Sequence, residues 1–309
     1  MKIKYFYFVF LTMIFSIFTS CTKSTKNENT EKSGSNYLVN DTLVKIENPK
    51  LLEYREFVSE LDSTDILSVE KATLKFKEVF SNQRFGLADS GFVYFQQLMD
   101  TLELKLNEKF QADTAKYNAF AAGNVVSKKL INYQKQLYNN GFRIINLSQS
   151  AYIEQNRVYT INAFSSILSN EMNYYNAELN TESLEGFATD DSIIISPQKL
   201  VDRNVWYDRF IVNYPHFVFI ENCKKFRKAY LSYLFQGMSK TPVYLTSSDK
   251  KVLSPYFINA YDYLMQNFND SETAALVGPY FLALKEGQTA NTKSILKKYI
   301  IQGLIYDLH

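Results

Sequence analysis

The chain has 309 residues, of which 46% are hydrophobic, 16% aromatic and 21% charged. This is enough to bury a sizeable core, which excludes an intrinsically disordered chain, a collagen-like repeat and a disulfide-stabilised miniprotein. Apart from Lys2 and Lys4, basic and acidic residues are equal in number, so no nucleic-acid partner is expected. With only 10 Gly and 6 Pro, the composition favours long helices over a turn-rich β-sandwich.

The first twenty residues are organised like a signal peptide. Met1–Lys4 is a short basic segment, and Tyr5–Phe18 is an apolar run that only Thr12 and Ser16 interrupt. A transmembrane helix needs about 20 apolar residues, so this run has instead the length of a signal-peptide core. The segment therefore predicts export from the cytoplasm.

The apolar run ends in Phe18-Thr19-Ser20-Cys21, with small residues directly before a cysteine. This pattern resembles the lipobox of Gram-negative bacterial lipoproteins, with Phe18 where that family usually has Leu. The resemblance implies that residues 1–20 are cleaved and that Cys21 carries acyl chains such as palmitate. Thr22, at a position where Asp would favour the inner membrane, implies the periplasmic face of the outer membrane. An ordinary cleaved signal peptide and an uncleaved short anchor are the alternatives.

The remaining chain is expected to have a tether and a folded part. Residues 21–40 are predicted to form a flexible tether, because the stretch after Cys21 is rich in Ser, Thr, Asn, Lys and Glu. A helical body is expected over 41–237, followed by C-terminal helical hairpins over 254–309 that could pack with it as one domain.

Four helices are predicted in the first part of the body. Asn48-Pro49 is typical of a helix start. Apolar residues at spacings of three and four predict further helices over about 66–80 and 90–106. The fourth helix is expected to run from about Thr114 to the C-cap signal Asn139-Asn140-Gly141, with Gly123 as a place where it could bend.

A small β-hairpin is predicted next, because Phe142–Leu147 and Ala151–Glu154 are short β-rich runs separated by Ser148-Gln149-Ser150. Helical spacing resumes over 164–179. The segment Glu185–Ser196 is expected to be a loop, and its acidic pair Asp190-Asp191 is read as solvated rather than as a cation site.

Further helices are expected from the start signals Ser196-Pro197, Ser254-Pro255 and Asp270-Ser271. Others are predicted from His216 to Phe235 and from about Thr292 to the C-terminus. The predicted fold class is therefore mainly α, an irregular helical bundle or helical-hairpin array with one small β-hairpin.

Several kinds of chemistry are excluded by the residues present. The two histidines, His216 and His309, cannot supply a two-histidine metal motif on one helix. Once Cys21 is lipidated, Cys223 is the remaining thiol, which leaves no disulfide and no cysteine-rich zinc site. Cys223 lies on an apolar helical stripe and is about 10.5 Å along the helix axis from His216, too far for a catalytic pair. No metal and no cofactor is expected.

The segment 201–212 contains the candidate site residues. One stripe of the predicted helix carries an acid among valines, namely Val201, Val205, Asp208 and Val212. Asp208 should therefore point toward the core, where a carboxylate needs a partner or its pKa rises. A structural tie, to Arg203, Arg209 or a residue elsewhere, is favoured over a role as a general base.

The opposite face of the same helix carries Asp202, Trp206 and Arg209. Trp206 is the only tryptophan in the chain and falls among polar neighbours. Such a side chain either packs under another element or contacts a ligand or partner. Packing is favoured, and the second interpretation makes this face the candidate binding site.

The leading functional hypothesis is a lipid-anchored, non-enzymatic interaction or assembly module of the cell envelope. The alternatives are a small-molecule or glycan binding protein, with Trp206 and tyrosines against the ligand, and an enzyme of unfamiliar type that uses Asp208. A binding protein or an enzyme needs a concave pocket with converging polar groups, whereas an interaction module needs an exposed apolar patch or groove.

Overall fold

A computed structural model describes residues 48–147, 150–247 and 250–308. The chain divides into two units, Met1–Asn48 and Pro49–His309, and the fold described below is that of the second. The predicted signal peptide, Cys21 and the tether over 21–40 lie outside the described residues.

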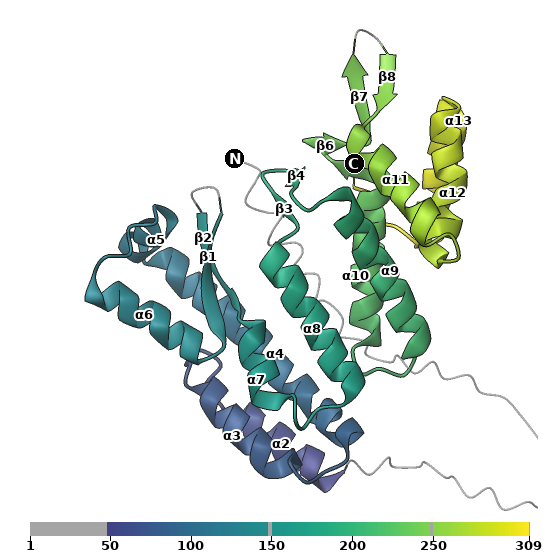
Figure 1. Ribbon diagram of the computed structural model, residues 1–309. Coiled ribbons are helices and arrows are strands. Elements are labelled where there is room, and N and C mark those ends of the chain that lie inside the picture. The colour runs from purple at the N-terminus through teal and green to yellow at the C-terminus, as the bar shows by residue number, and fades with distance from the viewer. Residues whose placement is uncertain (1–47, 148–149, 248–249, 309) are drawn as a thin grey trace, which may run out of the picture. The chain divides into compact units, whose positions relative to one another are not determined.

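The mainly helical fold class is confirmed (Figure 1). The described residues form twelve helices: α2 Pro49–Ser59, α3 Ser68–Phe80, α4 Phe85–Ala112, α5 Thr114–Ala121, α6 Lys128–Asn139, α7 Arg157–Phe164, α8 Asn170–Glu185, α9 Pro197–Asn213, α10 Ile220–Gln236, α11 Pro255–Asn267, α12 Glu272–Lys285 and α13 Thr289–Ile301.

The described part of the chain also contains four two-stranded antiparallel sheets. They are formed by the strand pairs β1 Phe142–Leu147 with β2 Ser150–Gln155, β3 Ala188–Thr189 with β4 Ser192–Ile193, β5 Gly237–Met238 with β6 Thr241–Pro242, and β7 Tyr244–Ser247 with β8 Lys250–Leu253.

In the first half of the fold, which comprises α2 to α7 with β1 and β2, phenylalanine side chains form much of the core. Phe76 of α3 meets Phe164 of α7 edge to face, with ring centroids 4.8 Å apart, and Phe92 of α4 is stacked at 5.7 Å from Phe95. Helices α3 and α4 approach closely at Gly91, where an added Cβ would lie 2.4 Å from the Phe80 ring. A side chain at Gly91 would therefore force the two helices apart.

The predicted hairpin is present as β1 and β2, which pair in the register Phe142 with Gln155. It is attached to α4 through Asn107. The Asn107 amide donates to the Ile153 carbonyl oxygen at 2.6 Å and accepts from the Ile153 N–H at 2.8 Å. One side chain thereby satisfies both backbone groups of a residue in β2, which fixes the hairpin on the helix.

Helix α8 connects this first half to the second half, which comprises α9 to α13 with β3 to β8. It packs against α7, and its Tyr175 ring lies 5.1 Å from Phe217 and 5.9 Å from Phe219, which precede α10. In the second half, α9 packs against α10, α11 and α12, and α12 packs against α13 (Figure 1). The buried side chains of both halves belong to one hydrophobic core.

Several predicted boundaries are wrong. The single helix expected from Thr114 to Asn139 is two helices, because Gly123 adopts a left-handed φ of 71° and Ser127 begins a new helix by accepting from the Leu130 N–H. The helical stretch expected over 164–179 is likewise divided between α7 and α8, since Ser169 caps α8.

Other differences lie in the second half. Helix α10 starts at Ile220 rather than His216, and α13 runs over 289–301 rather than to the C-terminus. The polar stretch that separates the body from the C-terminal helices contains β7 and β8, which carry no strong sequence signal. The acidic pair Asp190-Asp191 forms the two-residue turn between β3 and β4, with φ of 47° and 60°, as a type I′ hairpin requires.

Candidate functional site

Asp208 lies in α9 and is 5% exposed. Arg227 of α10 donates to its Oδ1, and the backbone N–H of Thr273 in α12 donates to its Oδ2 at 2.7 Å. Arg227 also contacts Glu272 at 3.2 Å. The inward direction expected for Asp208 is therefore correct. Its partners come from two other helices and not from Arg203 or Arg209.

Asp202 and Arg209 contact α11 and its end. The Tyr263 hydroxyl donates to Asp202 Oδ1 at 3.0 Å, and the Arg209 guanidinium lies over the Phe268 ring at 5.2 Å. Both side chains thus help to attach α11 to α9. Val212, expected on the buried stripe with Asp208, is 72% exposed, because α9 ends one residue later at Asn213.

Trp206 is half-buried in an aromatic group. Its ring is stacked on Phe210 at 4.7 Å and lies 5.1 Å from Tyr174 of α8 and 4.9 Å from Tyr207. Its indole N–H is buried without a hydrogen-bond partner among the described residues. The four predicted site residues therefore diverge: Trp206 contacts α8, Asp202 and Arg209 contact α11, and Asp208 contacts α10 and α12.

Arg203, which the sequence offered only as a partner for Asp208, lies at the centre of a buried network. It is 3% exposed and donates to the Tyr230 hydroxyl at 3.2 Å, to Glu185 at 3.1 Å and to the Gly186 carbonyl oxygen at 2.8 Å. Tyr230 in turn donates to Glu182 at 2.8 Å. Burial raises the pKa of Glu182 to about 7, although the Arg203 charge opposes the shift. The network holds α8, α9 and α10 together.

A second buried polar group, around Asp100 and Glu103, is not revealed by the sequence pattern. Asp100 and Glu103 lie one turn apart on α4, and Gln155 of β2 donates to Asp100 at 2.8 Å. Gln96 also donates to Asp100, at 2.7 Å, and accepts from Arg157 at 3.0 Å. Burial, followed by the neighbouring Asp100 charge, raises the pKa of Glu103 to about 8. Glu103 was missed because it falls at the margin of an apolar stripe, and spacing alone does not distinguish it from an exposed acid.

Cys223 is fully buried, and burial raises the pKa of its thiol to about 12. The thiol therefore stays protonated at neutral pH. This agrees with its expected place in the core rather than in a catalytic site.

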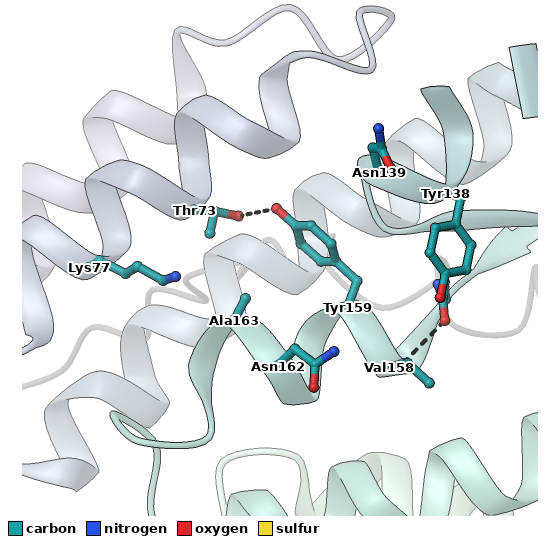
Figure 2. Close-up of a pocket in the computed structure, with 9 residues that line it drawn as sticks. Thr73, Lys77, Tyr138, Asn139, Val158, Tyr159, Asn162 and Ala163 are labelled. Atoms are coloured by element: carbon teal, nitrogen blue, oxygen red, sulfur yellow. Dashed lines mark hydrogen bonds between the residues drawn. The ribbon is translucent and has the colours of Figure 1, made fainter. Parts of the chain in front are cut away.

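A surface cavity of about 310 Å³ opens between α3, α6 and α7 (Figure 2). It is lined by amides, tyrosines, one lysine and small side chains, namely Thr73, Lys77, Tyr138, Asn139, Asn156, Val158, Tyr159, Asn162 and Ala163. We call this cavity the α3–α7 groove. No sequence signal pointed to it, because its residues come from three helices.

Within the described residues, no three His, Cys, Asp or Glu side chains gather in a way that could hold a metal ion. The same residues contain no helix with both the length and the apolarity needed to cross a bilayer. The chain matches no protein-family model, and comparison with curated proteins and with solved structures yields no match.

Proposed function

We propose that the protein is a lipid-anchored, non-enzymatic interaction or assembly module on the periplasmic face of the outer membrane. The observation that carries this proposal is the apolar run Tyr5–Phe18 followed by Thr19-Ser20-Cys21, which resembles a lipoprotein signal peptide and lipidation site. A single lipid-modified residue followed by a polar tether would hold the folded part at the membrane surface.

The contacts of Asp208 weigh against the enzyme hypothesis. Asp208, the acid that the enzyme hypothesis requires, uses both carboxylate oxygens to join α9 to α10 and α12. A general base needs an oxygen that can reach a substrate proton, whereas Asp208 is 5% exposed and each of its oxygens already accepts a hydrogen bond from another helix.

One observation favours the alternative of a small-ligand or glycan binding protein. The α3–α7 groove combines exposed amides with tyrosine rings, which is the mixture of polar and aromatic groups expected of a ligand site. The groove and a lipid anchor are compatible, since they occupy different parts of the chain.

Crosslinking in the native envelope tests the assembly proposal. Full-length tagged protein would be crosslinked in cells, purified and analysed by mass spectrometry beside Cys21→Ala. Thr22→Ala serves as the matched control because it changes the adjacent residue and keeps the cysteine. We expect one envelope protein in near-stoichiometric amount, lost or reduced in Cys21→Ala and unchanged in Thr22→Ala. Recovery of the protein alone from both wild type and control would contradict the proposal.

A further inference from the structure

Two tyrosines form the aromatic part of the α3–α7 groove. Tyr159 is fixed in place, because its hydroxyl is hydrogen-bonded to Thr73 at 2.9 Å. Tyr138 is 57% exposed, and Figure 2 shows Tyr159 between Lys77 and Tyr138. Exposed aromatic rings with few side-chain torsions provide flat apolar contact area at low entropic cost.

Two asparagines provide free hydrogen-bonding groups at the same place. Asn139 and Asn162 are exposed and make no side-chain hydrogen bond to any described residue. An asparagine side chain offers two N–H donors and an accepting oxygen, so it can pair with neighbouring hydroxyl groups that both donate and accept. Rings beside amides suit a ligand with an apolar face and a hydroxylated edge, which describes a sugar.

The charge of the residues that line the groove indicates which kind of sugar would bind there. Lys77 is the one charged side chain among the groove residues, and no described residue forms an ion pair with it. The groove also lies at the first turn of α7, which is the positive end of the helix dipole. The N–H groups of Val158 and Tyr159 are already bonded to Asn156. Helix α7 would therefore attract an anion through its dipole and not through free N–H donors.

The volume limits the size of the ligand. A cavity of about 310 Å³ is at the lower end of the range of ligand pockets, about 300–1,000 Å³, which suits one sugar unit. We propose that the α3–α7 groove binds a sugar unit that carries a carboxylate, with its ring against Tyr138 and Tyr159 and its carboxylate on Lys77. This site is independent of the lipid anchor and of any protein partner.

Ligand-observed NMR titration of the full chain in detergent tests this proposal, with sodium glucuronate, glucose and sodium acetate as probes at low salt. We expect glucuronate to bind more tightly than glucose by roughly fivefold or more, because only glucuronate can pair with Lys77. Acetate should bind more weakly than either sugar, since it lacks the ring. Raising the salt concentration should reduce the difference between glucuronate and glucose.

Matched variants locate the binding. Lys77→Gln should remove the preference for glucuronate, whereas Lys71→Gln, which neutralises an exposed lysine of the same helix outside the groove, should leave it unchanged. Tyr138→Ala should weaken glucuronate and glucose alike, by roughly threefold or more, because it removes a ring that both sugars use. Circular dichroism would establish that each variant is folded.

Three results would overturn the proposal: equal binding of glucose and glucuronate, acetate binding as strongly as glucuronate, or no sugar binding by the folded wild-type chain. None of these results bears on the envelope crosslink, so failure of the groove proposal and failure of the assembly proposal are distinguishable.

Discussion

Asp208 in α9 accepts a hydrogen bond at 2.7 Å from the backbone N–H of Thr273, the second residue of α12 and 65 positions later in the chain. The carboxylate lies at the positive end of the α12 dipole and also receives the Arg227 guanidinium of α10. One buried charge thus connects three helices, and its energetic role can be measured.

Asp208→Asn should lower the free energy of unfolding by about 2–4 kcal/mol, because the substitution leaves the mostly buried Arg227 without its main counter-ion. Urea denaturation measures the change. Asp202→Asn is the control, because Asp202 is half-buried and accepts one tyrosine hydrogen bond, and it should cost less than about 1 kcal/mol. A variant of Asp208 as stable as wild type would show that this connection does not support the fold.

Glu103→Gln should change how stability depends on pH. In the folded chain the Glu103 pKa is raised to about 8 from an ordinary 4.5, so the folded state keeps a proton that the unfolded state releases. Stability contributed by this proton is complete below the ordinary pKa and is lost as pH rises through about 8.

Glutamine mimics the protonated acid, so the variant should match wild type near pH 4 and exceed it near pH 8.5 by on the order of 2 kcal/mol. Urea denaturation across this range gives the curves. Glu108→Gln, an exposed position on the same helix, should follow wild type throughout. Parallel curves for wild type and Glu103→Gln would exclude a raised pKa at Glu103.

Asn107→Ala should loosen the β1–β2 hairpin. The substitution removes both hydrogen bonds to Ile153 and leaves its backbone groups without partners from α4. We expect a loss of about 2 kcal/mol in unfolding free energy and faster amide hydrogen exchange in β2. Asn132→Ala, at an exposed position of α6, should alter neither quantity. Unchanged exchange in β2 would mean that other contacts hold the hairpin.

The fluorescence of Trp206 reports how far its indole ring is exposed to solvent. Tyr174, which is 50% exposed, lies 5.1 Å from the indole ring, so wild-type emission should be blue-shifted and protected from iodide. Tyr174→Ala should shift the emission to the red and increase quenching, whereas Tyr138→Ala should change neither. Ready quenching in wild type would instead leave Trp206 available as a ligand contact.

Local signals predicted much of the fold. Ser196-Pro197 and Ser254-Pro255 each begin a helix, because serine is favoured at the N-cap position and proline at the first helical position. The division between α5 and α6 was missed, because a glycine inside a helical pattern is compatible with either a bend or an end until its φ is known.

The candidate sites were less predictable. Spacing showed that Asp208 faces inward, but its partners Arg227 and Thr273 lie on helices whose packing no local pattern reveals. The α3–α7 groove depends in the same way on three separate helices, since Lys77, Tyr138 and Asn162 have no shared periodicity. Sequence patterns give the direction of a side chain on its own helix, whereas a site requires the packing between helices.

Lipid anchoring through Cys21 is best tested by mass spectrometry of the N-terminal peptide of the membrane-purified protein. We expect a chain that begins at Cys21 with acyl chains attached, and loss of this species in Cys21→Ala. An unmodified Cys21, in a chain cleaved elsewhere or not cleaved at all, would contradict it.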